Sequence, residues 1–337
     1  MSQTYKKKSP SVEKKETSEK IDILLDTYLE NIFKLSESKN LELEIRFGTR
    51  NIYPITKIDY INVIKTLIGQ GFEIVKDDLY LLRIQNELLD EKTGRNKIGN
   101  IRTEVEGLYN IEDYCKKNNI LSLLANGHVS FTQKSYLSNK DDILYPVNQD
   151  DFNFRMSLQI ENNLSESSED VQRIITSWND NKKVFRFLKR ARLVHKDLPV
   201  FVDLSIVKTS KKNKQYYVPE FDFKSADVLN QNEHFEIELE VDNQKIADVP
   251  IFQNQTELLA SIKKAIKFVL CGLQQSNYPI SYLEQDKVIH EYLKIIKDAD
   301  YKESFTPNPK DFIGPSSLTL QMQNIISLDV KQDSDSI

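Results

Sequence analysis

The stretch LELEIRFG, residues 41–48, alternates strictly between apolar and charged side chains. In an extended strand, successive side chains point to opposite faces, so this alternation separates two sets of residues. The apolar face carries Leu41, Leu43, Ile45 and Phe47, and the charged face carries Glu42, Glu44 and Arg46. The pattern predicts a β-strand whose apolar face packs against a core.

A second stretch of the same kind, FEIELEV, occupies residues 235–241 and puts Glu236, Glu238 and Glu240 on one face without a cation among them. A solvated outer face explains either strand taken alone. Aligned carboxylates repel one another, however, and solvated strand faces usually mix charges. Magnesium and manganese ions prefer oxygen ligands, so two such strands brought together predict a divalent-metal site that needs no His or Cys.

Cations follow the same parity on the strands between these two stretches. Residues 185–193 align Arg186, Arg190 and Arg192 on one face, and guanidinium groups grip phosphate oxygens in a bidentate manner. Four further cations lie inside other alternating stretches: Arg83, Arg102, Lys134 and Arg155. Any one of them taken singly is explained by a surface ion pair. Together with five glutamates they predict a lumen that holds a metal and an oligophosphate.

Short alternating stretches separated by polar turns predict an antiparallel sheet or barrel within an α+β fold. These strands are expected at 72–75, 79–84, 100–105, 129–136, 152–160, 184–194, 200–207, 216–221 and 235–241. Apolar residues at helical spacing predict helices at 21–35, 57–68, 111–117, 167–179 and 256–273. No Gly-rich phosphate-binding loop is present in the sequence.

Composition narrows the class of protein. The chain has 337 residues, of which 39% are hydrophobic, so it can bury a sizeable core. Its net charge of −5 excludes a uniformly basic surface for wrapping duplex nucleic acid. Two cysteines exclude a disulfide framework, and no apolar run approaches the ~20 residues of a membrane span. We therefore expect a cytoplasmic protein that does not enter a membrane.

The order, parity and separation of ELEIRFG and FEIELEV resemble those of the triphosphate tunnel metalloenzymes, specifically the N-terminal RNA 5′-triphosphatase domain of mRNA-capping enzymes from DNA viruses or linear plasmids. Residues 310–320, preceded by residues 274–281, look like the junction at which such enzymes enter a guanylyltransferase domain. The resemblance implies an eight-stranded antiparallel β-barrel, the triphosphate tunnel, with flanking helices.

The resemblance also implies roles for individual residues. Its metal ligands for Mn²⁺ or Mg²⁺ would be Glu42, Glu44, Glu236, Glu238 and Glu240. Arg46, Arg190 and Arg192 would offset charge on the transferred phosphoryl group, and Glu238 would orient and deprotonate the attacking water. Substrate-binding roles are expected for Lys134, Arg155, Arg186, Arg102 and Asp203. Phe201 departs from the family pattern, which often has a basic residue two positions before this Asp.

The expected activity is metal-dependent removal of the γ-phosphate from 5′-triphosphate RNA, the first step of mRNA capping, with nucleoside triphosphates as side substrates. Guanylyltransferase and methyltransferase domains of the same or a partner chain are the expected partners. Two alternatives remain open. An inorganic or thiamine triphosphatase-like tunnel enzyme would have Lys in place of Arg46, and a non-catalytic scaffold of a capping complex would not need the lumen glutamates.

Three regions are expected along the chain: a disordered basic tail at 1–20, the tunnel domain at 21–272, and a linker with a truncated guanylyltransferase start at 273–337. The last region is expected to be the more mobile. The motif Lys-x-Asp-Gly is absent from the sequence, so we expect no lysine-guanylate transfer. The chain would then be an excised part of a capping enzyme or a natural truncation.

Overall fold

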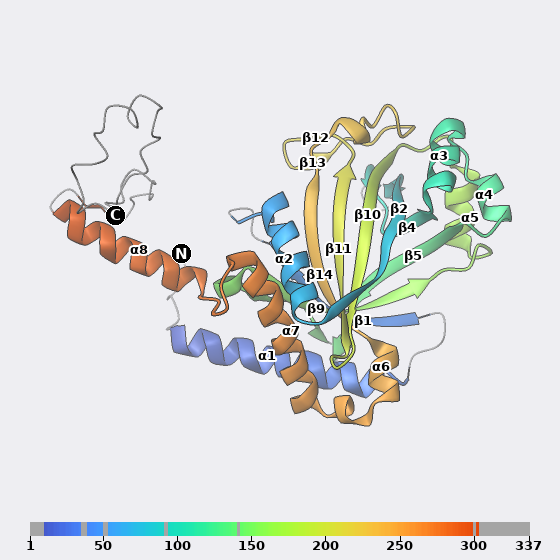
Figure 1. Cartoon of the computed structure of the whole chain (residues 1–337). Coiled ribbons are helices and arrows are strands. Elements are labelled where there is room, and N and C mark those ends of the chain that lie inside the picture. Colours follow the sequence, from blue (N-terminus) through green and yellow to red (C-terminus); the bar gives the residue numbers. More distant parts are fainter. Residues whose placement is uncertain are drawn as a thin grey trace, which may run out of the picture. The chain divides into compact units, whose positions relative to one another are not determined.

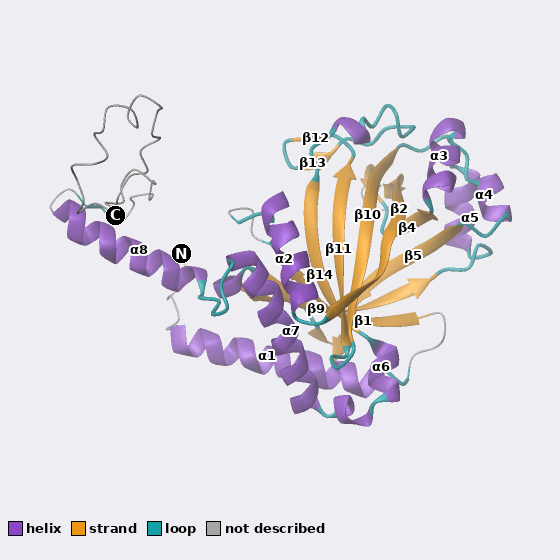
Figure 2. Cartoon of the chain, viewed as in Figure 1, coloured by secondary structure: helices purple, strands orange, loops and turns teal. Residues whose placement is uncertain are grey.

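The computed structural model describes residues 10–34, 39–49, 53–90, 94–139, 142–298 and 301–302. The chain divides into two compact units, the first ending at Pro279 and the second beginning at Ile280. Figure 1 shows the elements in chain order and Figure 2 separates helices from strands. Within the described residues, the first unit contains every strand and the second contains one helix, α8 (Tyr282–Lys297).

Eight antiparallel strands close into a barrel. They follow one another in the order β1-β14-β11-β10-β2-β4-β5-β9, and β9 pairs again with β1. The bounds are β1 (Lys39–Phe47), β2 (Phe72–Asp90), β4 (Ile101–Glu106), β5 (Val129–Tyr136), β9 (Phe154–Asn163), β10 (Lys183–His195), β11 (Val200–Thr209) and β14 (His234–Val241). This topology confirms the expected α+β fold with an eight-stranded antiparallel barrel.

Three helices cover one side of the barrel: α1 (Pro10–Asn31), α2 (Lys57–Gly69) and α7 (Gln255–Gln274). They pack on the apolar faces of β1, β9, β11 and β14, where Leu43 and Leu239 are fully buried. The α2–α7 contact is close, because a Cβ at Gly272 would lie 2.6 Å from the Cα of Val63. Any larger residue at position 272 would push the two helices apart.

A second cluster of buried side chains covers the opposite flank. It is formed by α3 (Leu108–Lys117), α4 (Leu121–Ala125) and α5 (Glu169–Thr176) over β2, β4 and β5. Tyr114 and Trp178 lie at its centre, with ring centroids 6.0 Å apart. Because helices take up the apolar faces on both sides, the charged faces of the strands are left to line the interior of the barrel.

The remaining elements are short. Strand β3 (Arg95–Ile98) extends β2, and β8 (Val147–Gln149) pairs with β9. Two small ribbons lie outside the barrel: β6 (Ser138–Asn139) with β7 (Asp142–Ile143), and β12 (Lys212–Asn213) with β13 (Tyr216–Tyr217). Helix α6 (Asn243–Asp248) follows β14, and 3₁₀ turns occupy Asp150–Phe152, Val228–Asn230 and Pro250–Gln253. Among the described residues no helix is long and apolar enough to cross a membrane.

Several boundaries differ from the sequence-based expectation. Helix α1 begins at Pro10, so residues 10–20 are helical rather than part of a disordered tail. Proline is well tolerated in the first turn of a helix, and the Glu and Lys residues after it are good helix formers. The first unit ends at Pro279 rather than at residue 272. Residues 1–9 of the expected tail, and 310–320 of the expected guanylyltransferase junction, lie outside the described residues.

Two of the predicted strand regions differ from the strands in the structure. The stretches expected at 72–75 and 79–84 form the single strand β2, whose pairing with β10 contains irregular register near Arg192. The strand expected at 216–221 shrinks to β13, which pairs only with β12. A β-bulge absorbs extra residues without ending a strand, which explains why the polar residues 76–78 do not interrupt β2.

Candidate functional site

The interior of the barrel is a cavity of about 730 Å³ lined mainly by charged side chains. Strand β1 contributes Glu42, Glu44 and Arg46, which the alternation in LELEIRFG turns inward while the leucines turn outward. The predicted site residues that line the cavity are Glu42, Glu44, Arg46, Arg102, Lys134, Arg155, Arg186, Arg190, Arg192, Glu238 and Glu240. The period-two alternation of the strands thus places these side chains on the cavity side.

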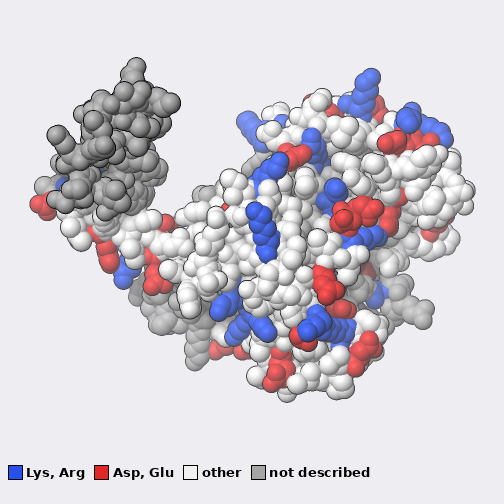
Figure 3. Space-filling model, in the orientation of Figure 1, with Lys and Arg blue, Asp and Glu red and all other residues white. Residues whose placement is uncertain are grey.

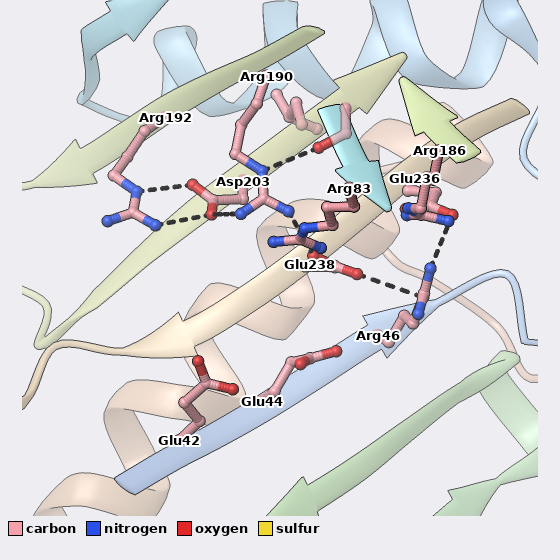
Figure 4. Close-up of polar contacts among 12 residues, drawn as sticks. Glu42, Glu44, Arg46, Arg83, Arg186, Arg190, Arg192, Asp203, Glu236 and Glu238 are labelled. Atoms are coloured by element: carbon pink, nitrogen blue, oxygen red, sulfur yellow. Dashed lines mark hydrogen bonds and ion pairs between the residues drawn. The ribbon is translucent and has the colours of Figure 1, made fainter. Parts of the chain in front are cut away.

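A continuous chain of ion pairs crosses one wall of the cavity (Figure 4). It runs from Arg192 through Asp203, Arg190, Glu238, Arg46 and Glu236 to Arg186. Asp203, only 2% exposed, accepts hydrogen bonds from both Arg190 and Arg192. These side chains come from β10, β11, β14 and β1, so the chain of charges connects four neighbouring strands.

Four other carboxylates gather around a single lysine. The ammonium group of Lys134 forms an ion pair with Glu42 and lies 3.9 Å from carboxylate oxygens of Glu44 and Glu161. Glu240 stands directly opposite Glu44 in the β1–β14 register and also lines the cavity. One ammonium group thus faces a cluster of glutamates from β1, β9 and β14.

Electrostatics divide the glutamates into two groups. Burial would raise the pKa of Glu238, but Arg46 and Arg190 outweigh burial and lower it to about 2. Burial and the neighbouring Glu42 instead raise the pKa of Glu240 well above its usual value. Burial also raises the pKa of Glu42 and of Glu44, despite Lys134. Glu42, Glu44 and Glu240 therefore have too little positive charge nearby to offset their burial, whereas Glu238, between two arginines, has enough.

This division bears on the expected metal site. Among the described residues no three His, Cys, Asp or Glu side chains already form a metal-binding group. Glu42, Glu44 and Glu240 nonetheless place carboxylate oxygens, the donors that Mg²⁺ and Mn²⁺ prefer, around a single ammonium group. Because burial raises the pKa of all three, a divalent cation would stabilise their charged forms. Glu236 does not share this environment, because Arg46 and Arg186 both pair with it. The residues present therefore fit a hard divalent cation through three of the five predicted glutamates.

Glu238 lies between two arginines, since Arg46 and Arg190 both pair with its carboxylate, and these cations lower its pKa to about 2. Its expected role in orienting and deprotonating the attacking water stays a prediction.

Two arginines in the cavity have no ion pair or hydrogen bond within the part of the chain that the structure describes: Arg102 on β4 and Arg155 on β9. Burial and the nearby Arg83 lower the pKa of Arg102. Arg83 itself is occupied, with its Nε 2.6 Å from Glu104. Unpaired guanidinium groups in a cavity are costly without an anion, so Arg102 and Arg155 are available to bind one.

Sequence reasoning did not assign some residues of the cavity. Glu161 and Glu104 pair with predicted cations, and Phe201 stacks on Arg192, whose Cζ lies 3.8 Å from the ring centroid. Alternation in residues 155–161 and 102–104 would have placed both glutamates in the lumen. The stacking of Phe201 depends on the β10–β11 register, and no local pattern in the sequence gives that register.

Comparisons with known proteins return no matching family model and no matching curated protein. Solved structures are similar to this chain at low identity. The Mimivirus capping enzyme triphosphatase is 14% identical, with a TM-score of 0.41, covering 71% of this chain and 95% of its own. The S. pombe Pct1 RNA triphosphatase is 16% identical, with a TM-score of 0.37, covering 79% and 96%. The same protein in complex with the Spt5 CTD is 14% identical, with a TM-score of 0.38 and the same coverage.

Proposed function

We propose that this chain is a metal-dependent polynucleotide 5′-triphosphatase that removes the γ-phosphate of 5′-triphosphate RNA, the first step of mRNA capping. The observation that supports the proposal is that one cavity contains two kinds of site. It holds glutamates with too little positive charge around them, and it holds Arg102 and Arg155, which have no ion-pair partner among the described residues. Such a cavity would bind a metal ion at the glutamates and, beside it, an oligophosphate at the arginines.

Glu42, Glu44 and Glu240 would hold Mg²⁺ or Mn²⁺. A bound divalent cation supplies charge neutralisation and polarises a phosphate oxygen. Arg102, Arg155 and Lys134 would bind the phosphate chain, and Arg46, Arg190 and Arg192 would face charge that develops on the transferred phosphoryl group. Asp203 and Glu238 fix the orientation of these arginines before substrate arrives, which reduces the reorganisation needed in the transition state.

Asp203 therefore acts as a positioning residue rather than a direct phosphate contact. Arg186 is bound to Glu236, so its phosphate contact would require that this pair loosen. Free ATP and GTP are expected side substrates, because the charged lining recognises phosphate groups. Association with guanylyltransferase and methyltransferase activities, of this chain or of a partner, follows from the proposed place in capping.

The test is release of phosphate from γ-labelled 5′-triphosphate RNA with Mn²⁺, with Mg²⁺ and with chelator. We expect metal-dependent release that is lost in Glu42→Gln and Glu240→Gln and kept in Glu73→Gln, a control on the exposed surface of β2. A folded protein that releases no phosphate with either metal would contradict the proposal and favour a scaffold. Faster turnover of inorganic tripolyphosphate than of RNA would favour an inorganic triphosphatase.

A further inference from the structure

One end of the cavity carries a small ribbon, β12–β13, that the proposed chemistry does not use. Its inner residue, Tyr217, lines the cavity together with Arg186 and Phe185. The ribbon follows directly after β11, and its base is tied to the start of β10, because Phe185 N–H donates to Ser210 Oγ and Ser210 N–H donates to Phe185 O. The ribbon therefore stands at a mouth of the tunnel.

The ribbon exposes two lysines, Lys212 and Lys214, and two adjacent tyrosines, Tyr216 and Tyr217. Tyr216 is 69% exposed and Tyr217 is 40% exposed, and Phe221 nearby is 47% exposed. The ammonium group of Lys212 lies 4.7 Å from the centroid of the Tyr217 ring. Within the described residues Lys212 and Lys214 pair with no carboxylate. Figure 3 shows several Lys and Arg side chains around the end of the molecule where Figure 1 places this ribbon.

The backbone conformation at the turn of the ribbon is unfavourable for the lysine that occupies it. Lys214 has a φ of 56°, in the left-handed region where glycine or asparagine is less strained.

The two ends of the cavity differ in charge. Near the ribbon, Arg186 stands opposite Arg83 in the β10–β2 register, and each of these two arginines pairs with a glutamate. Arg102 lies near both and has no ion-pair partner among the described residues, so the cations outnumber the carboxylates that pair with them. The opposite end is lined by Asn40, Asp242, Asn243 and Gln244, next to the glutamate cluster. A polyanionic chain is attracted to the first end and repelled from the second. The ribbon end is therefore where a nucleic acid would enter.

We propose that β12–β13 binds the single-stranded RNA behind its triphosphate end, with bases stacked on Tyr216 and Tyr217 and backbone phosphates near Lys212 and Lys214. This inference rests on the proposed function and adds the site that makes RNA, rather than a free nucleotide, the preferred substrate. Stacking on aromatic rings is tolerant of sequence because every base presents a flat face. The surface thus favours RNA without selecting its sequence.

The binding test uses a labelled single-stranded RNA with a 5′-hydroxyl end, so that the triphosphate site does not contribute. Fluorescence anisotropy gives its Kd across a range of salt for the full chain. In Lys212→Ala/Lys214→Ala we expect the slope of log K against log salt to fall by roughly 1.4, at about 0.7 per lost phosphate contact. Tyr216→Ala should weaken binding at least about fivefold, the lower bound for one stacked base.

Controls are Tyr278→Ala, 80% exposed, and Lys76→Ala, 49% exposed, which lie outside the ribbon in the same compact unit and should change neither the slope nor the Kd. Circular dichroism checks that each variant is folded. An unchanged slope and Kd in the ribbon variants would overturn the inference and point to another partner for this surface.

Turnover separates this inference from the proposed function. The ratio of kcat/KM for triphosphate RNA to kcat/KM for ATP should fall in the ribbon variants and stay constant in the controls. If the ratio is unaltered and RNA turnover is normal, RNA binding by the ribbon is rejected, but the proposed triphosphatase activity is not. Wild-type protein that binds RNA through the ribbon yet releases no phosphate would reject the triphosphatase instead.

Discussion

Asp203 holds the guanidinium group of Arg192 side-on, with Nε 2.7 Å from Oδ1 and Nη2 2.7 Å from Oδ2. The same carboxylate accepts a hydrogen bond of 2.8 Å from Nη1 of Arg190. On its flat side Arg192 stacks on Phe201, which occupies the position where a basic residue was expected. One aspartate and one aromatic ring thus fix an arginine that faces the cavity.

Asp203→Asn tests this arrangement. The change keeps the shape of the side chain but removes the negative charge that compensates two arginines, of which Arg190 is only 10% exposed. We expect the free energy of unfolding to fall by about 3 kcal/mol, as for a broken buried ion pair. Urea denaturation measures it. Asp113→Asn, which breaks an exposed pair with Lys117, should cost less than about 1 kcal/mol, and an equal loss in both variants would contradict the prediction.

Lys134→Ala tests whether the lysine substitutes for a metal. In the metal-free protein its ammonium group offsets Glu42, Glu44 and Glu161. Without it, we expect lower thermal stability and Mn²⁺ affinity raised by about tenfold, because the cation no longer competes with an ammonium group. Titration followed by electron paramagnetic resonance gives the affinity. Lys76→Ala, which breaks an exposed pair with Glu106, is the control, and weaker Mn²⁺ binding in Lys134→Ala would refute the idea.

Arg102→Ala and Arg83→Ala form a matched pair. Arg102 has no ion-pair partner among the described residues, so its loss should raise KM for the triphosphate about tenfold without lowering the melting temperature. Loss of Arg83 should lower the melting temperature as well, because it leaves the Glu104 carboxylate unpaired. Steady-state kinetics and thermal melts separate the two. A lower melting temperature in Arg102→Ala would indicate a structural rather than a ligand-binding arginine.

The buried Lys183 should make the free energy of unfolding depend on pH. Its side chain is fully buried, and burial lowers the pKa of its ammonium group to about 8. Between pH 8 and the ordinary lysine value of 10.5, the unfolded chain binds a proton that the folded chain does not. The free energy of unfolding contributed by this group therefore rises with pH across that window, by about 3 kcal/mol.

Lys183→Met removes the titrating group and keeps a side chain of similar length, so the rise should disappear. Lys182→Met, at the neighbouring position beside the Phe221 ring, should keep it. Urea denaturation between pH 7 and pH 10.5 compares the three proteins. Identical pH profiles for the wild type and Lys183→Met would show that Lys183 does not titrate in this range.

Strand parity was available from the sequence because it depends only on the two-residue period of an extended chain. That period was enough to turn Glu42, Glu44 and Arg46 toward one face and Leu43 toward the other, and to do the same for Glu238 and Glu240. The cations Arg102, Arg155 and Arg190 followed from the same rule. Most of the charged lining of the lumen could therefore be predicted from local alternation alone.

The partners of these charges were decided by tertiary structure. Glu236 and Glu240 have the same parity and lie four residues apart, yet Glu236 pairs with Arg46 and Arg186 while Glu240 lies in the cluster around Lys134. Which charge faces which depends on strand order, register and closure of the barrel between β9 and β1. Those features arise from contacts between residues far apart in the chain, and local alternation contains no information about them. The sequence by itself determined which side chains enter the tunnel, and only the folded barrel decided which of them are neutralised and which remain free to bind.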